Sequence, residues 1–183
     1  MNKTNIKIDG DRIYLREVRL SDVNQIYVNW LNDPEVNQYL ETRNDVQTID
    51  SVQKYVEKMV VNDNELFFAI CLIENDKHIG NIKLGPINLV HHFAEVSLLI
   101  GDKNEWGKGI ATEAIYFLTK YSIEILKLHK LTAGCYANNI GSVKAFEKVG
   151  FNIEGIWKDH YLCNTEYVDR ICLGLINKNK EIA

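Results

Sequence analysis

The stretch Asn104–Ala114, N-E-W-G-K-G-I-A-T-E-A, places Gly107 and Gly109 directly before a segment with helical character. It follows the strand-like segment V-S-L-L-I-G at 96–101. The first amides of a helix have no intrahelical partner, and the helix dipole adds partial positive charge there. Glycine has no Cβ, so the backbone can turn tightly and approach a ligand. The stretch therefore predicts a phosphate or diphosphate site, with a plain glycine turn as the alternative.

The spacing of these glycines excludes two common nucleotide-binding motifs. The pattern G-x-x-x-x-G-K-[S/T] is absent, and Thr112 stands where G-x-G-x-x-G needs its last glycine. Net charge is −4 with both signs interspersed, which argues against a nucleic-acid-binding face.

The same bulk features favour a cytoplasmic protein. The first ten residues lack the apolar core expected of a signal peptide, and no apolar run reaches membrane-spanning length. The four cysteines form no C-x-x-C pair and lie in apolar stretches, which predicts reduced core thiols. No linker or repeat marks a joint, so residues 1–183 are expected to form one domain.

Hydrophobic patterning predicts an α/β (α+β) order of elements, with an antiparallel front half that argues against a doubly wound dinucleotide fold. The expected strands are 12–18, 65–73, 79–89, 93–101, 130–137, 151–157 and 167–176.

Helix signals fall between these strands. Ser21 is the expected cap of a helix over 22–31, and Pro34 suits a first helical turn. The expected buried face of the 22–31 helix is formed by Val23, Ile26, Tyr27, Trp30 and Leu31. Thr48 or Asp50 would cap a helix that runs to Val60, and a long helix follows Gly109. The expected buried stripe of the long helix after Gly109 is formed by Ala111, Ala114, Ile115, Leu118, Ile125 and Leu126. A short helix is expected over 140–149 with Gly150 as its C-cap.

A second motif lies in L-T-A-G-C-Y-A-N-N-I-G-S-V-K-A-F-E-K-V-G-F, residues 131–151. Together the two segments resemble the GNAT superfamily of acetyl-CoA-dependent N-acetyltransferases, and most of all its RimJ/RimL-type branch. That family carries [Q/R]-x-x-G-x-[G/A] and N-x-x-S…E-K-x-G-F, which read here as N-E-W-G-K-G, N-N-I-G-S and F-E-K-V-G-F. W-L-N-D-P-E-V at 30–36 resembles the same branch. The likeness runs from about Arg12 to Leu175 and implies a mixed, mostly antiparallel central sheet flanked by helices.

The resemblance implies acetyl-CoA as co-substrate and no metal. The loop backbone would hold the diphosphate, with Asn104 where the family has Gln or Arg, and the pantetheine arm would follow the central strand where two strands splay apart. Asn139 would bind that arm, or cap the next helix, or do both. The implied cofactor-binding residues are Val96, Leu98, Leu99, Ile100, Asn104, Trp106, Gly107, Lys108, Gly109, Ile110, Ala111, Asn139, Ser142 and Phe146.

The chemistry is attack of an amine on a thioester. An alkylammonium has a pKa of roughly 10, so a base must accept a proton first. Glu95 is the expected base, because some family members carry their base on this strand; the alternative is an outward-facing strand glutamate. Phe146 replaces the tyrosine that many members use as the acid, so Ser142 is the expected acid, as in RimL-like members. Alternatively Ser142 only caps its helix or contacts the cofactor, or no acid is needed.

The acceptor side carries weaker signals. Trp30, Tyr39 and Glu41 are candidate walls of the acceptor site, with core packing as the better reading for Trp30. Asp159–Tyr161 is expected to be a polar strand or loop segment, and contact with the substrate is the second reading. His91 and His92 are adjacent, so in a strand they would face opposite ways, which is poor geometry for a metal.

No cysteine lies in a nucleophile motif, so direct transfer in a ternary complex is expected. The acceptor is either a protein or peptide N-terminus or a small amine, such as a polyamine, an aminoglycoside or an amino-sugar nucleotide. The alternatives are a non-catalytic CoA-binding sensor or interaction module and a phosphate-binding domain unrelated to CoA. A homodimer is a further expectation from the resemblance.

Overall fold

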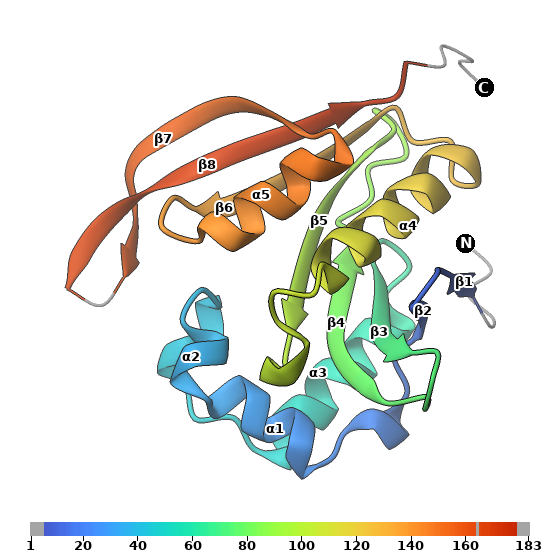
Figure 1. Ribbon diagram of the computed structural model, residues 1–183, viewed down its shortest axis with the longest axis vertical. Coiled ribbons are helices and arrows are strands. Elements are labelled where there is room, and N and C mark those ends of the chain that lie inside the picture. Colours follow the sequence, from blue (N-terminus) through green and yellow to red (C-terminus); the bar gives the residue numbers. More distant parts are fainter. Residues whose placement is uncertain (1–5, 164, 179–183) are drawn as a thin grey trace.

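The strands form one continuous sheet. The computed structural model describes residues 6–163 and 165–178. In this part of the chain, eight strands lie in the order β1-β2-β3-β4-β5-β6-β8-β7 (Figure 1). They are β1 (Lys7–Asp9), β2 (Ile13–Glu17), β3 (Leu66–Leu72), β4 (His78–Leu84), β5 (Phe93–Ile100), β6 (Lys130–Tyr136), β7 (Asn152–Cys163) and β8 (Glu166–Ile176).

Neighbouring strands run antiparallel except β5 and β6, which are parallel. The β5–β6 pairing is short and ends where Glu95 pairs with Thr132. Beyond that point β5 pairs only with β4, up to Ile100. The two strands therefore separate after Glu95. The predicted mixed, mostly antiparallel sheet is confirmed.

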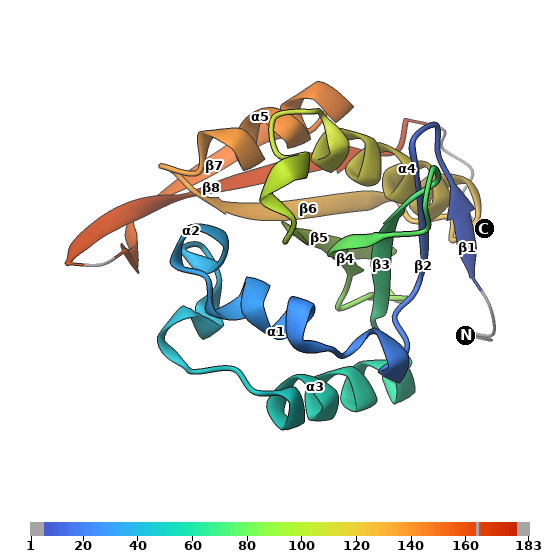
Figure 2. The ribbon, with the colours of Figure 1, turned by 60° about the horizontal axis from the view of Figure 1, so that its bottom comes forward.

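Helices cover both faces of this sheet. Figure 2 shows α4 (Ile110–Glu124) and α5 (Ile140–Val149) on one face, with α1 (Gln25–Asn32), α2 (Pro34–Asn37) and α3 (Ile49–Val61) on the other. Three short 3-10 helices occur in the described residues, η1 (Leu20–Asp22), η2 (Glu41–Asn44) and η3 (Lys103–Glu105). Over the described ranges, the helices are all too short or too polar to cross a membrane.

Two apolar clusters hold the layers together. The larger cluster lies between the sheet and α4 and α5, and includes Phe68, Ile115 and Leu118. The smaller lies between the sheet and α1 and α3, and includes Tyr27 and Val56. Each fully buried side chain of this size contributes about 1.5–3 kcal/mol, so the sheet is stabilised from both faces.

The first helix begins later than the pattern predicts. Asn24 is its cap and accepts a hydrogen bond from the amide of the third helical residue, at 3.1 Å. Ser21 lies instead in η1, a separate turn that Asp22 closes by accepting a bond from the Arg19 amide. The prediction that Ser21 caps the helix is therefore wrong. Ile26 is 59% exposed, so its predicted place on the buried face is also wrong.

Most other helix boundaries agree with the sequence signals. Thr48 caps α3, Pro34 is the first residue of α2, and Gly150 ends α5 with a φ of 104°. The predicted buried position of Ile125 is wrong. α4 ends at Glu124, and Ile125 is 64% exposed.

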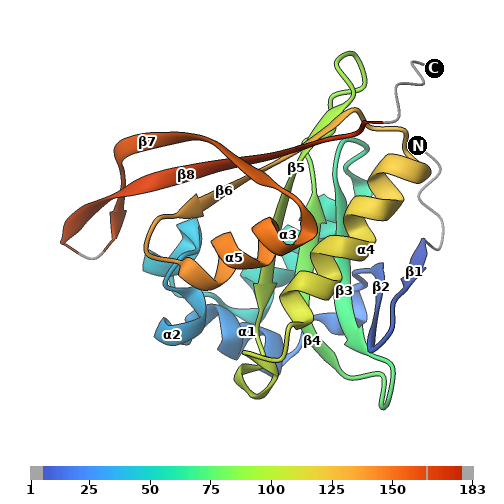
Figure 3. The same cartoon turned by 45° about the horizontal axis from the view of Figure 1, so that its top comes forward.

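Two strands differ from the predicted lengths. β4 ends at Leu84 rather than Leu89, because the chain turns at Gly85–Pro86. β7 continues to Cys163, because it pairs with β8 on both sides of an irregularity between Trp157 and Tyr161. Figure 3 shows this long β7–β8 hairpin reaching beyond the helices.

The cysteines and the histidine pair also need correction. All four cysteines are free, but only Cys71 and Cys135 are buried. Cys163 and Cys172 are partly exposed because they lie on the β7–β8 hairpin, so the prediction of four core thiols is wrong for these two. The adjacent pair at 91–92 lies in the turn before β5 rather than in a strand.

Candidate active site

A cavity of about 730 Å³ occupies the gap that opens between β5 and β6. Its wall combines the free end of β5, the glycine loop with the first turn of α4, the end of β6, α5, and the segment around α2 and η2. From the predicted set, the lining residues are Val96, Leu98, Leu99, Ile100, Trp106, Gly107, Gly109, Ile110, Ala111, Asn139, Ser142, Phe146, Tyr39 and Glu41.

The glycine loop has the backbone geometry of an anion site. Gly107 and Gly109 have φ values of 73° and 80°, in the left-handed region that favours glycine. Gly109 is the N-cap of α4. Among the described residues, the amides of 107–112 donate no backbone hydrogen bond. The loop therefore presents free donors at the positive end of a helix dipole.

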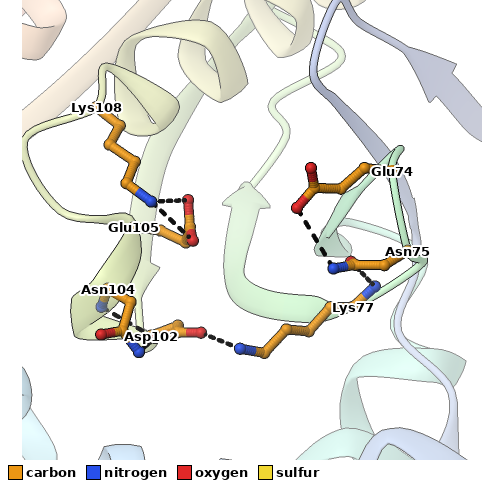
Figure 4. Close-up of polar contacts among 7 residues, drawn as sticks. All are labelled: Glu74, Asn75, Lys77, Asp102, Asn104, Glu105 and Lys108. Atoms are coloured by element: carbon orange, nitrogen blue, oxygen red, sulfur yellow. Dashed lines mark hydrogen bonds and ion pairs between the residues drawn. The ribbon is translucent and has the colours of Figure 1, made fainter.

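The start of this loop is held by Asp102 (Figure 4). This buried carboxylate accepts bonds from the backbone and side-chain nitrogens of Asn104, both at 3.0 Å, and forms an ion pair with Lys77. Burial alone would raise the pKa of Asp102, but Lys77 and Asn104 lower it. The Asn104 side chain thus stabilises the loop and does not line the cavity.

The rest of the loop is held by further side-chain contacts. The Trp106 indole nitrogen donates to the Ile100 carbonyl at 2.8 Å. The Lys108 ammonium pairs with Glu105 at 3.2 Å, and the two side chains point toward each other in Figure 4. The Lys108 side chain is not part of the cavity wall, whereas Glu105 is.

α5 brings its first turn to the same cavity. Asn139 caps this helix, with its Oδ1 accepting from the Ser142 amide at 3.2 Å, as the alternative reading of that residue predicts. The Ser142 hydroxyl lies 3.3 Å from the Cys135 thiol, and burial raises the pKa of that thiol. Phe146 is 2% exposed and packs edge-on against Phe151, so no phenol occupies this position.

Tyrosines and a glutamate form the other end of the cavity. The ring of Tyr136 is 5.4 Å from that of Tyr39 and stacks on that of Tyr161 at 4.0 Å. Its hydroxyl donates to Glu41 at 2.9 Å and accepts from Arg43 at 2.9 Å. Burial and the bond to Glu41 raise the pKa of Tyr136 to about 12, so the phenol keeps its proton at neutral pH.

Glu95 lies beside this cavity, at the last residue pair before the strands separate. Its side chain faces away from the α4 layer, because its buried neighbours Ala94 and Val96 point into that layer. Arg170 donates to Glu95 at 3.3 Å and lies over Trp157, 4.8 Å from the ring centroid. Glu95 itself does not line the cavity wall.

Trp30 belongs to the core rather than to the cavity wall. It is 8% exposed, and its ring lies against Gly101 and 5.2 Å from the His78 ring. The core-packing reading of this residue is confirmed. Its contact with Gly101 couples α1 to the start of the glycine loop.

Sequence reasoning missed Tyr136, Cys135 and Arg170. In T-A-G-C-Y-A, the neighbours Cys135 and Tyr136 must face opposite sides of a strand. This alternation was a signal that the two side chains point to different ends of the site. Arg170 gave no local signal, because its contact with Glu95 joins strands distant in sequence. Tyr161, which lines the cavity, lies in the polar segment named as a second-choice substrate contact.

The described residues contain no group of three or more His, Cys, Asp or Glu side chains that could hold a metal. A second cavity of about 670 Å³ lies between β1–β3 and α3. Its lining contains neither the glycine loop nor the separated strands. The gap between β5 and β6 is therefore the candidate active site.

Comparisons with known proteins agree with this geometry. The sequence matches the acetyltransferase (GNAT) domain family over residues 12–152. A probable N-acetyltransferase of Bacillus subtilis (strain 168), YjcK, is 30% identical over 182 residues, covering 95% of this chain and 99% of that protein.

Solved structures share the fold. Spermidine N-acetyltransferase from Vibrio cholerae, solved in complex with CoA and spermine, superposes with a TM-score of 0.81 at 25% identity, covering 90% of this chain and 95% of that one. A GNAT acetyltransferase from Bacillus anthracis gives the same TM-score at 23% identity, covering 93% of this chain and 98% of that one. With the glycine loop, the separated strands and the family match in agreement, the chain belongs to the GNAT acetyltransferase family and is an acetyl-CoA-dependent N-acetyltransferase.

Proposed function

We propose that this enzyme acetylates a small primary amine by direct attack in a ternary complex. The observation that carries the proposal is that one cavity holds both ends of the candidate site. This cavity joins the glycine loop at one end to Tyr39, Glu41 and Tyr161 at the other, through the gap between β5 and β6. Two substrates that enter from opposite ends would meet in this gap.

At the cofactor end, the free amides of 107–111 would hold the diphosphate of acetyl-CoA. The pantetheine arm would lie along Val96–Ile100, and Asn139 and Phe146 would line its path. Lys108 and Asn104 would act indirectly, since their side chains are bound to Glu105 and Asp102.

At the acceptor end, Glu41 and the three tyrosine rings would receive a cationic amine, because carboxylates and aromatic faces both attract ammonium groups. The likeness to spermidine acetyltransferases supports a small amine, with polyamines as the first class to test. A peptide N-terminus, the acceptor class that RimJ/RimL-type membership favours, is the second candidate.

Glu95 would accept the proton from the ammonium, directly or through one water, at the point where the strands separate. The free amine then forms the N–C bond, its nitrogen releases a second proton to solvent, and the C–S bond to coenzyme A breaks. Ser142 would donate its proton to the leaving thiolate and recover one from solvent. The N-terminus of α5 would favour that thiolate, because helix dipoles stabilise negative charge there.

Three further expectations belong to this proposal. The whole chain acts as one domain, it works in the cytoplasm, and it forms a homodimer. Support for a homodimer comes from exposed apolar side chains on the β7–β8 hairpin, among them Ile153, Ile156 and Trp157.

The test is release of free thiol from acetyl-CoA with a panel of amines. The panel holds spermidine, an aminoglycoside, an amino-sugar nucleotide and peptides with different N-termini. We expect turnover with a small amine and a several-fold lower kcat in Ser142→Ala. Turnover with peptides alone would overturn the small-amine proposal and support the RimJ/RimL-type reading.

A further inference from the structure

We infer that Arg12 is a positioning residue for the diphosphate loop. It holds the Lys108 carbonyl on the outer side of the loop and balances the charge of Glu113. The inference rests on the proposed diphosphate site and does not depend on which amine is the acceptor.

Arg12 joins three parts of the chain at one point. It stands directly before β2, yet its Nε donates to Glu113 of α4 at 2.7 Å and its Nη1 donates to the Lys108 carbonyl at 2.8 Å. Nη2 would lie 3.6 Å from a Cβ placed on Gly109. The guanidinium therefore lies directly behind the glycine loop.

The orientation of one peptide unit follows from these contacts. In a planar trans peptide, the C=O and the N–H point in opposite directions. Because the Lys108 carbonyl points to Arg12, the Gly109 N–H points away from Arg12. Gly109 lines the cavity and Arg12 does not. The hydrogen bond from Arg12 therefore directs a loop donor toward the cavity.

The charge of Glu113 gives Arg12 a second role. Glu113 is buried in the first turn of α4, and its Oε1 accepts bonds from the amides of residues 11–13 at 2.7–3.2 Å. Burial would raise the pKa of Glu113, but the bonds from Arg12 lower it, so the carboxylate is ionised. An unbalanced negative charge at this helix terminus would oppose a bound diphosphate.

Two lysines near the loop already have acidic partners. Lys77 pairs with Asp102, and Lys108 pairs with Glu105. Arg12 differs from these two lysines because it contacts both the loop backbone and the first turn of α4.

The experiment compares Arg12→Met and Arg12→Lys with wild type by calorimetric titration. The probes are CoA, dephospho-CoA, which keeps the diphosphate, and pantetheine, which lacks it. Lys54→Met is the matched control, because it removes a cation from an exposed ion pair on α3. Thermal unfolding checks that each variant is folded. Arg12→Lys keeps the charge and serves as a second variant if Arg12→Met does not fold.

We expect Arg12→Met to bind CoA and dephospho-CoA about tenfold more weakly, with pantetheine unchanged. Arg12→Lys should lie between wild type and Arg12→Met, because one ammonium cannot reproduce both contacts of the guanidinium fork. CoA affinity within twofold of wild type in Arg12→Met, or an equal loss for pantetheine, would overturn the inference. Binding needs no amine, so a failure here is distinct from a failure to find an acceptor.

Discussion

The two ends of the cavity are built from different parts of the polypeptide. The cofactor end is mostly backbone, namely the free amides of 107–112 and the left-handed glycines Gly107 and Gly109. The acceptor end is mostly side chains, in which Tyr136 joins Glu41 and Arg43 between two other tyrosine rings.

This difference decides how each end can change. A backbone site tolerates replacement of its side chains, as Asn104 and Lys108 illustrate by bonding to neighbours rather than lining the cavity. A side-chain site changes its ligand with each substitution. The acceptor end is therefore where enzymes of this fold can differ in specificity while sharing one cofactor.

The largest effect is expected at the junction of the two ends, in Glu95→Gln. Loss of the proton acceptor should lower kcat by about a hundredfold, while KM for acetyl-CoA stays within twofold. Steady-state kinetics at saturating amine measures both values. Glu154→Gln, another strand glutamate paired with a cation, is the matched control and should behave as wild type. An unchanged kcat in Glu95→Gln would remove Glu95 from the mechanism.

Gly109→Val should damage the cofactor end alone. The residue has a φ of 80°, where a β-branched side chain is strained by about 1–3 kcal/mol, so CoA should bind about ten- to a hundredfold more weakly. Titration with CoA gives the affinity, and KM for the amine should not change.

Gly155→Val is its control, because that glycine has open space and no left-handed φ. If both glycine variants weaken CoA equally, the backbone account of the cofactor end is wrong.

Tyr136→Phe should damage the acceptor end alone. It keeps the stacked ring but removes the hydroxyl that joins Glu41 and Arg43, so KM for the amine should rise about fivefold. CoA affinity should be unchanged in titration. Tyr116→Phe, on the exposed side of α4, is the comparison. A loss of CoA affinity in Tyr136→Phe would mean that the two ends are not separable.

The last expected effect is on stability rather than on binding or turnover, in Glu113→Gln. The folded-state pKa of Glu113 is lowered, so its contribution is present above the unfolded value of 4.5 and is lost as pH falls through the folded value. The variant should be about 1–2 kcal/mol less stable at pH 7 and depend less on pH below about 4.5. Urea unfolding across this range measures both, with exposed Glu57→Gln as control. Equal acid slopes in Glu113→Gln and wild type would contradict the assignment.

The difference between the backbone-built cofactor end and the side-chain-built acceptor end also determines which features could be predicted from the sequence. The glycine loop, the cap Asn139 and the short helix that ends at Gly150 are local features, and their positions were predicted from adjacent residues. Among the helix starts, that of the first helix was predicted wrongly, because Asn24 competes with Ser21 as a cap.

Contacts between distant segments could not be predicted in this way. Tyr136 meets Glu41 across 95 positions of sequence, and Arg170 meets Glu95 across 75. Such pairs depend on strand order, in particular on β8 lying beside β6. Residue type did separate one case, because core packing was the better reading for Trp30, which is in the core, while Tyr39 lines the cavity.

The separation of β5 and β6 also has a thermodynamic consequence. β4 forms hydrogen bonds with the main-chain groups on one side of β5. Because the N–H and C=O groups of successive residues point to alternate sides of a strand, those of Val96 and Leu98 point into the gap. The sheet of the free enzyme therefore has main-chain groups at this gap that no neighbouring strand in the described part of the chain pairs with. The two amide bonds of a pantetheine arm would act as a short extra strand, and the cofactor would stabilise the fold as well as supply the acetyl group. Stability would then rise with cofactor concentration, by RT ln(1 + [L]/Kd).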